Sequence, residues 1–306
     1  MTPKICMVGS SNYDMISRVP RLLKPGETLA GSSFQTSFGG KGANQAVMAA
    51  KLGAQVTVVT KIGRDVFGND TLRNYHDQGI DTTYLMYDES RSSGVAVITV
   101  EESTGQNTII IVAGANGTLS PDDVRAAQSA IVSADVLMCQ LEVPQAATLE
   151  ALRIARAGGK TLAILNPAPA APLPDKMLQL ADIFAPNEVE AAMLTGMPTD
   201  TVEQAAAAGQ VLRQRGPKTV VMTLGKRGAL LIEGDGQPQH VPAQPVQAVD
   251  SSGAGDAFIG SLAYFLGAKL PMRAAVERAC AIATRTVLKT GTQTSFPNRD
   301  EVADLL

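Results

Sequence analysis

Short apolar runs alternate with amphipathic stretches along most of this 306-residue chain. The runs have the length of buried strands, and the stretches between them have helical spacing and end in glycine, which suits a helix C-cap. The expected strands are 5–9, 56–60, 136–142, 161–165 and 219–225, and the expected helices are 42–53, 70–79, 145–159 and 202–216. This alternation predicts an α/β fold in which helices cover both faces of a mostly parallel sheet.

Two regions interrupt the alternation, at residues 13–37 and 90–112. They contain the strand-like stretches ETLAGSSFQTSF, GVAVITVEE and QNTIIIVAG, with a turn signal, STGQN, between the last two. We interpret them as a small antiparallel sheet that projects from a single domain spanning residues 1–306. Because its edges and apolar residues are exposed, such a sheet can serve as a lid over a site or as a dimer surface.

The charge balance and the lengths of the apolar segments exclude several classes of protein. The chain has 26 Lys and Arg against 29 Asp and Glu, a net charge of -3, and no basic cluster, so we expect no nucleic-acid partner. The apolar run near the start is too short for a signal peptide, and no segment has the apolar length needed to span a bilayer. We therefore expect a cytoplasmic protein without membrane contact.

The cysteine and histidine content limits the possible chemistry. Cys6, Cys139 and Cys280 lie far apart in apolar runs, so we expect reduced core residues rather than disulfides. The chain has only two histidines, His76 and His240, and no close Cys/His spacing. A zinc site or a Ser-His-Asp site is therefore not expected.

The stretch DSSGAGDAF, residues 250–258, places a carboxylate, Asp256, where a glycine-rich loop enters an apolar run. Such a loop offers backbone N–H groups to an anion when it opens a helix. It does not fit a dinucleotide fingerprint, because Phe258 occupies the position of the third glycine. An aspartate at a helix start is also an ordinary cap, so this stretch alone leaves both a capping and a catalytic role open.

A second glycine-rich stretch, SFGGKGANQAV, covers residues 37–47. It is not a Walker motif, because Gly42 follows Lys41 where a Ser or Thr is required. We expect a tight turn at a helix start, with Lys41 and Asn44 on one face and able to hold the hydroxyls of a polyhydroxy ligand. An ordinary helix start with a solvated lysine explains the same pattern.

Polar side chains also follow two of the expected strands. Asn12 and Asp14 come after the first strand, and Glu142 ends the third. Open α/β sheets bind ligands at the carboxyl ends of their strands, and amides and carboxylates are the groups that sugar sites use. The alternatives are a turn residue for Asp14 and a surface salt bridge for Glu142.

Five motifs in order carry a resemblance to a known family: GGKGANQA (39–46), NPAPA (166–170), APNEVEA (185–191), TLGKRG (223–228) and DSSGAGDAF (250–258). Together they resemble the ribokinase branch of the ribokinase-like, or PfkB, carbohydrate kinases, and the resemblance covers nearly the whole chain. It implies a three-layer α/β sandwich with a central, mostly parallel sheet and a small β-sheet lid. It also implies a homodimer in which the lids of two subunits pair.

The resemblance implies an ATP-dependent kinase and gives the GAGD loop two roles. In this family the aspartate that ends the loop takes the proton from a primary sugar hydroxyl, while the N–H groups of the loop hold the γ-phosphoryl group. On this basis Asp256 is the expected base, and Gly253, Ala254 and Gly255 line the expected anion hole.

The resemblance also implies the binding residues. On the sugar side they are Asn12, Asp14, Gly40, Lys41, Asn44, Glu142 and Asp256. On the ATP side they are Asn187, Glu190, Thr223, Gly225, Gly228, Gly255 and Cys280. Glu190 completes an N-x-x-E motif associated with Mg²⁺ and phosphate, although a capping box with Asn187 explains that pattern as well. A K⁺ site is implied at Asp250, Ser252, Thr286, Lys289, Gly291 and Ser295, several of them through backbone oxygens.

The sequence departs from the family pattern at two places, and it leaves several phosphoryl acceptors open. The loop reads DSSG where DTTG is commoner, and Tyr13 stands where smaller residues are frequent, although strand alternation should turn it away from the sugar. The first hypothesis is phosphorylation of D-ribose to D-ribose 5-phosphate. Deoxyribose, another pentose, a ketohexose or a nucleoside are alternatives within the same class, and a non-catalytic sugar- or nucleotide-binding protein is the alternative outside it.

Overall fold

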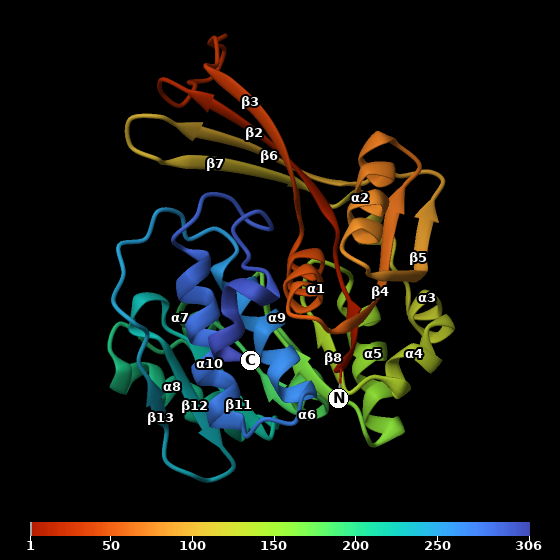
Figure 1. The fold of residues 1–306 in the computed structure, drawn as a ribbon, viewed down its shortest axis with the longest axis vertical. Helices are drawn as coiled ribbons and strands as arrows, with labels where there is room; N and C mark the ends of the chain where they lie inside the picture. The colour runs from red at the N-terminus through yellow and green to blue at the C-terminus, as the bar shows by residue number, and fades with distance from the viewer. Residues whose placement is uncertain (1) are drawn as a thin grey trace.

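The structure is a computed structural model that describes residues 2–306. In these residues the main sheet has nine strands in the order β13-β12-β11-β10-β9-β8-β1-β4-β5 (Figure 1). The strands are β1 (Lys4–Val8), β4 (Gln55–Gly63), β5 (Asp81–Asp88), β8 (Val136–Cys139), β9 (Leu162–Leu165), β10 (Ile183–Phe184), β11 (Thr219–Thr223), β12 (Ala229–Glu233) and β13 (Gln239–Val241). The pairs from β5 to β11 are parallel, and β12 and β13 add an antiparallel edge.

Helices cover both faces of this sheet, and residues in β1 alternate between them. Ile5 and Met7 pack with α1 (Lys41–Lys51), α9 (Ala254–Gly267) and α10 (Met272–Thr286). Cys6 and Val8 pack into the layer on the opposite face, which receives six other helices. Those helices are α3 (Pro121–Ala126), α4 (Gln128–Ser133), α5 (Gln145–Gly158), α6 (Asp175–Leu180), α7 (Glu188–Thr195) and α8 (Val202–Gln214). The predicted mixed α/β fold with a mostly parallel sheet is confirmed.

All five predicted strands and all four predicted helices are present, the remaining helix being α2 (Val66–Asp77). A glycine with positive φ follows each of these helices, as the C-cap signals predict. Four strands were not predicted. β10 has only two residues, and the edge strands β5 and β13 contain polar residues that weaken the apolar signal. β12 is a short apolar strand that follows directly on β11. None of the helices in the described part of the chain combines the length and apolar character that crossing a membrane requires.

A second sheet of four strands projects from one end of the body (Figure 1). Its order is β3-β2-β6-β7, with β2 (Asn12–Val19), β3 (Ser33–Gly39), β6 (Gly94–Glu101) and β7 (Asn107–Val112). We call this sheet the lid. The expectation of an antiparallel sheet was wrong for its centre, because β2 and β6 both leave the body in the same direction and pair in parallel. The expected strand at residues 27–38 was also too long, since β3 starts at Ser33.

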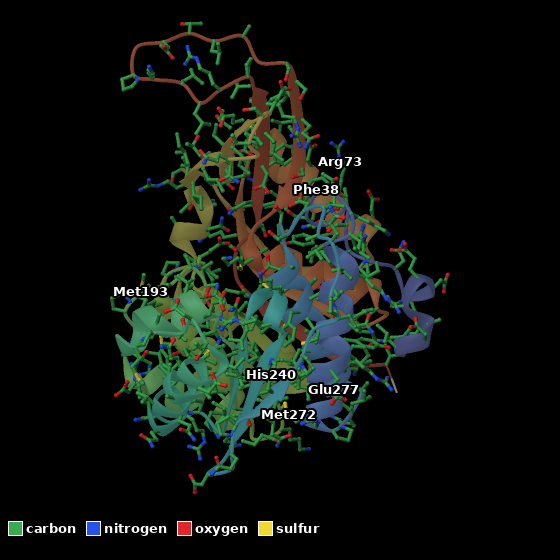
Figure 2. The ribbon with its side chains drawn as sticks, turned by 90° about the vertical axis from the view of Figure 1, so that its left-hand side faces the viewer. Phe38, Arg73, Met193, His240, Met272 and Glu277 are labelled. Atoms are coloured by element: carbon green, nitrogen blue, oxygen red, sulfur yellow. The ribbon has the colours of Figure 1, made fainter. Side chains whose placement is uncertain are left out.

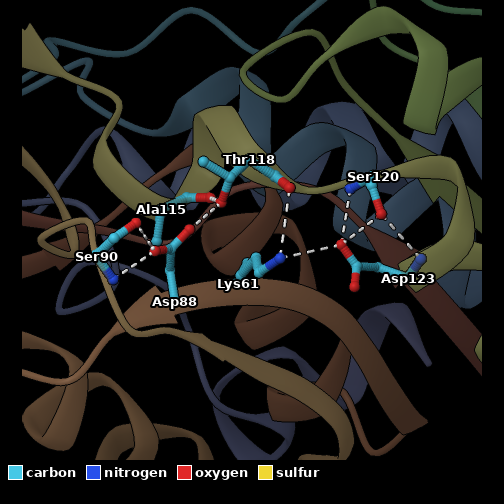
Figure 3. A network of polar contacts seen from close by, with 7 residues as sticks. All are labelled: Lys61, Asp88, Ser90, Ala115, Thr118, Ser120 and Asp123. Carbon is cyan, nitrogen blue, oxygen red and sulfur yellow. Dashed lines mark hydrogen bonds and ion pairs between the residues drawn. The ribbon is translucent and has the colours of Figure 1, made fainter.

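A polar network holds the segments where the lid rejoins the body (Figure 3). The Asp88 carboxylate at the end of β5 accepts hydrogen bonds from Ser90 and from the Thr118 hydroxyl. Lys61 on β4 donates to the Thr118 carbonyl at 3.4 Å and to Asp123 at 3.2 Å. This network ties two strands of the main sheet to the turn that follows β7, so it fixes the base of the lid.

Candidate active site

The start of α9 places Asp256 beside an exposed helix N-terminus. Gly253 precedes the helix with φ 75°, and a Cβ there would lie 2.5 Å from Thr292 Cγ2, so the turn requires glycine. At Gly255 an added Cβ would meet nothing within 4 Å, so this side of the turn is open. The first amides of a helix have no acceptor within the helix and carry its positive dipole end. The turn can therefore bind an anion.

The two glycine-rich motifs meet at Asp256, although they are more than 200 residues apart in sequence. Asn44 Nδ2 donates to Asp256 Oδ2 at 2.9 Å, and Gln45 Nε2 donates to Asp256 Oδ1 at 3.0 Å. The Asp256 side chain does not cap its own helix, and the residue is only 8% exposed. The carboxylate is thus held by side chains of α1 rather than by α9.

The electrostatic surroundings of Asp256 adjust its proton affinity. Burial raises its pKa, and the charge of Glu142 acts in the same direction. The Lys41 charge and the two amide donors lower the pKa but do not cancel the effect of burial. A carboxylate with a raised pKa is a stronger base than an ordinary aspartate while it remains ionised.

The glycine turn before α1 brings the loop against the start of β2. Gly40 has φ 85°, and a Cβ on it would lie 2.6 Å from the Asn12 amide nitrogen. A Cβ on Gly39 would lie 2.3 Å from an Asp14 carboxylate oxygen. Only glycines allow this close approach, which places Asn12 and Asp14 next to the first turn of α1.

Glu142 and Lys41 complete this side of the site. Glu142 lies three residues beyond the end of β8, and its carboxylate accepts from the Ser10 hydroxyl and from the Lys41 amide at 2.8 Å. Glu142 therefore accepts hydrogen bonds within the site and does not form the surface salt bridge that was the alternative explanation. Burial lowers the Lys41 pKa, but the charges of three carboxylates outweigh it and raise the pKa, so the ammonium stays charged.

Asn12 and Asp14 are both oriented by their surroundings. Asn116 Nδ2 donates to Asn12 Oδ1 at 2.8 Å, which leaves the Asn12 Nδ2 free to face a ligand. Burial, followed by the charges of Glu142 and Asp256, raises the Asp14 pKa to about 7. Tyr13 turns to the other face of β2, as strand alternation predicts, and its ring packs on Phe38, labelled in Figure 2.

A cavity of about 460 Å³ opens next to the α9 turn. It brings together five of the residues predicted on the ATP side, namely Thr223, Gly225, Gly228, Gly255 and Cys280. Residues 243–246 and Ala248, in the loop after β13, form another wall that was not predicted, with apolar contributions from Pro245 and Val246. The only signal for this loop was its position directly before the DSSGAGD stretch. The walls are largely apolar, as is usual for a small-molecule site.

Asn187 and Glu190 form the capping box that was the alternative explanation of the N-x-x-E motif. Asn187 Oδ1 accepts from the Glu190 amide at 2.8 Å, and Glu190 accepts in return from the Asn187 amide at 2.8 Å. Asn187 also pairs with Thr223, which lines the cavity. Burial raises the Glu190 pKa to about 7, although the Lys41 charge lowers it. The Asn187–Glu190 cap thus lies between Lys41 and the cavity.

The residues predicted for a K⁺ site lie in two adjoining loops, except Thr286, which is the last residue of α10. The Asp250 carboxylate accepts from the amides of Ser252 and Gly291, each at 2.9 Å, so it holds the loops together. The hydroxyls of Thr286 and Ser295 donate to backbone carbonyls, and the Lys289 ammonium pairs with Glu301. These contacts hold the loops in place, and oxygen atoms are the ligands that a hard cation would take from them.

The two histidines lie outside this arrangement. His76 contacts Thr82, and His240 on β13 contacts the Arg227 carbonyl at 2.7 Å. In Figure 2 His240 lies on the body, well separated from the lid residue Phe38. Three residues that no sequence motif predicted hold the predicted residues in place: Gln45, Gln293 and Asn116.

A model of the pfkB family of carbohydrate kinases matches residues 2–299. The chain is 43% identical to ribokinase of Mus musculus over 303 residues, which is 97% of this chain and 93% of that protein. It is 40% identical over 303 residues to deoxyribokinase of Salmonella typhimurium, which is 99% of this chain and 98% of that protein. The solved structure of Arabidopsis thaliana ribokinase complexed with ribose and ATP is 33% identical, with a TM-score of 0.92, and the match covers 100% of this chain and 99% of that one.

Proposed function

Because the chain belongs to the pfkB family of carbohydrate kinases, we propose that it transfers the γ-phosphoryl group of ATP to the primary 5-hydroxyl of D-ribose, forming D-ribose 5-phosphate. The resemblance drawn from the five motifs is confirmed by a family match that spans nearly the whole chain. One observation carries the proposal. Asp256 lies where the two glycine turns meet, with Lys41 and Asn44 on one side and the apolar cavity on the other.

Asp256 is the proposed general base. Its carboxylate takes the proton of the primary hydroxyl as the oxygen of that hydroxyl bonds to the γ-phosphorus and ADP leaves. The amides of Gly253, Ala254 and Gly255 form the proposed anion hole at the positive end of α9, where they stabilise the charge on the phosphoryl oxygens. The carboxylate and the amides act on different oxygens, so their neighbouring positions do not conflict.

The sugar side of the proposal consists of Asn12, Asp14, Gly40, Lys41, Asn44 and Glu142. The Lys41 ammonium and the Asn44 amide lie on the first turn of α1, beside Asp256. Asn12 and Asp14 reach the same place from β2. Together these groups donate to and accept from several hydroxyls of one small polyol.

The proposed reaction uses two cations, Mg²⁺ and K⁺. Bound Mg²⁺ would offset the charge of the nucleotide phosphates. Residues 2–306 contain no group of three His, Cys, Asp or Glu side chains that could hold a metal. Mg²⁺ that binds together with a nucleotide usually takes its ligands from phosphate oxygens, water and one or two carboxylates. The oxygen donors of the Asp250 and Gly291 loops fit K⁺, and they adjoin the Gly253 turn that K⁺ would order.

Phosphorylation of 2-deoxy-D-ribose is the second candidate, because the deoxyribokinase relative is nearly as similar as the ribokinase relative. A site that hydrogen-bonds the 2-hydroxyl discriminates strongly against a sugar that lacks it. Asn12 and Asp14 are the residues proposed to bind that hydroxyl, and this favours ribose.

The test is ADP release with Mg-ATP and K⁺, comparing kcat/KM for D-ribose, 2-deoxy-D-ribose, fructose and adenosine. We expect a preference of at least about 100-fold for ribose over deoxyribose. Equal or better use of deoxyribose would contradict the assignment to ribose, and no turnover with any of the four would support the binding-protein alternative.

The lid is the proposed dimer surface of a cytoplasmic homodimer. Four apolar side chains on it are each more than half exposed: Phe34, Ile109, Ile110 and Ile111. Phe34 lies on β3 and the three isoleucines lie on β7, the two edge strands of the lid. Exposed apolar side chains on edge strands are typical of an interaction site. Analytical ultracentrifugation should give a dimer for the wild type and a monomer for Ile110→Glu. A monomeric wild-type chain would contradict this part of the proposal.

A further inference from the structure

The NPAPA motif and the last residue of GGKGANQ have no part in the proposed chemistry, yet they lie together behind Asp256. Asn166 begins the NPAPA motif after β9, and Gln45 lies on α1. Gln45 Nε2 donates to Asn166 Oδ1 at 3.1 Å and to Asp256 Oδ1 at 3.0 Å. One amide nitrogen therefore bridges the motif and the carboxylate.

The orientation of the Gln45 amide is determined by its neighbours. Gln140 Nε2, after β8, donates to Gln45 Oε1 at 2.6 Å. Asn166 Nδ2 donates to the Ala185 carbonyl at 2.8 Å, so the Asn166 oxygen must face Gln45. Gln45 and Gln140 are fully buried. Reversing the Gln45 amide would set its oxygen against two acceptors, so the observed orientation is the one that satisfies Gln45 and Asn166. Among the described residues, the buried Gln140 Oε1 is left without a hydrogen-bond partner.

We propose that Gln45 is a positioning residue for the reaction, held by Gln140 and Asn166, which fixes the Asp256 carboxylate in its reactive orientation. The inference rests on the proposed function of Asp256 as the base. Gln45 binds Oδ1 from the buried interior, so Oδ2, next to Asn44, is the oxygen that takes the proton of the sugar. A carboxylate held at both oxygens cannot rotate away from the attacking hydroxyl.

Gln45 also affects the protonation of Asp256. Its amide stabilises the ionised carboxylate and lowers the pKa against the effect of burial. The other charged groups that act on Asp256 are Lys41 from α1, Asp14 from β2, Glu142 from the loop after β8 and Glu190 from α7. Removing the Gln45 amide leaves these charges in place, so the Asp256 pKa should rise and the acidic limb of the kcat profile should move to higher pH.

The test compares Gln45→Met, which keeps the length of the side chain, with the wild type. We expect kcat to fall about 10- to 100-fold, the effect of losing a hydrogen bond to a charged group. The acidic limb of the kcat profile should move to higher pH by about one unit, while KM for ATP stays within about twofold of the wild-type value. Thr161→Val is the matched control, because it also removes a buried hydrogen bond, but this bond goes to the Ile131 carbonyl and is not part of the network around Asp256. It should leave kcat and the pH profile unchanged.

A second variant covers the case in which Gln45→Met does not fold. Asn166→Ala removes one of the two groups that hold Gln45, and kcat should fall about 3- to 10-fold with the same direction of pH shift. Asp256→Asn, measured in parallel, separates the two claims. If Asp256→Asn is inactive while both other variants keep the wild-type kcat and pH profile, the positioning role is overturned and the proposed function stands. If the wild-type chain phosphorylates no sugar, both fail.

Discussion

The two sides of the site are built in different ways. On the sugar side, the predicted residues are mostly buried or half-buried polar groups, and several are hydrogen-bonded to one another, as in the contacts of Asp256 with Asn44 and of Glu142 with Lys41. On the nucleotide side, the cavity walls are mostly apolar, and glycines at 225, 228 and 255 present backbone to the space. Polar side chains are therefore the main binding groups on the sugar side. On the nucleotide side, the shape of the cavity and its exposed backbone take that role.

This difference indicates where substitutions should matter. A prearranged polar network loses much when one member is removed, because its buried partners are left without hydrogen bonds. A wall of apolar contacts loses little when one side chain is trimmed, because the remaining contacts persist. Substitutions on the sugar side should therefore change kcat or sugar binding strongly, and those in the cavity should change KM for ATP weakly.

The largest effect is expected for Asp256→Asn. The amide cannot accept the proton of the hydroxyl, so kcat should fall by about 10²- to 10⁴-fold while calorimetry still detects binding of ATP and sugar. Asp182→Asn is the matched control, since Asp182 is also a buried carboxylate but pairs with Lys218 and the Ala163 amide. Near-normal turnover of Asp256→Asn would exclude the base assignment.

The second largest effect is expected for Asn44→Ala, and Lys41→Ala should also raise KM for sugar. Each change removes a polar group beside Asp256, so KM for sugar should rise about 10-fold or more, and KM for ATP should change much less. Gln145→Ala provides the comparison, because the Gln145 amide donates to the Pro172 carbonyl rather than to a residue of the site. If KM for ATP rose more than KM for sugar, the GGKGANQ turn would belong to the nucleotide side.

The pH dependence of sugar binding tests the role of Asp14. Its carboxyl has a pKa of about 7, so it is mostly protonated at pH 6 and mostly ionised at pH 8. A sugar hydroxyl donates to the ionised form, so binding should release protons and the Kd for ribose should fall by up to about 10-fold between these pH values. Calorimetry with wild type and Asp14→Asn measures this directly. A Kd independent of pH in the wild type would place Asp14 outside the sugar contacts.

The smallest effect is expected for Cys280→Ala in the cavity wall. Burial, together with the Glu277 charge, raises the Cys280 pKa to about 12, so the thiol stays protonated and unreactive. KM for ATP should change less than about threefold, kcat should not change, and iodoacetamide at pH 8 should not inactivate the enzyme. Rapid inactivation that ATP prevents would mean that the cavity wall is more open than the structure indicates.

The sequence was informative where a local pattern determines the structure. The glycine turn before Lys41, the apolar strands and the capping residues around Asn187 are all local, and the structure contains them. The parallel pairing of β2 with β6 was missed, because it joins strands about 80 residues apart and no local signal distinguishes it from an antiparallel hairpin.

The network behind the predicted site residues was missed for a similar reason. A glutamine in a helix, such as Gln45, carries no sign in the sequence that its amide is buried against a carboxylate more than 200 residues away. Gln293 donates to Asn44 Oδ1 at 3.0 Å from the loop that also contains Gly291. Such contacts become visible only when the fold brings distant elements together.

The most direct test of the account is the identity of the product formed from D-ribose and Mg-ATP, determined by proton-coupled ³¹P NMR. We expect the products to be ADP and a single phosphate ester whose phosphorus couples to the two protons on C5. An ester whose phosphorus couples to a single ring proton, or release of inorganic phosphate alone, would contradict the transfer to the primary hydroxyl that Asp256 is proposed to promote.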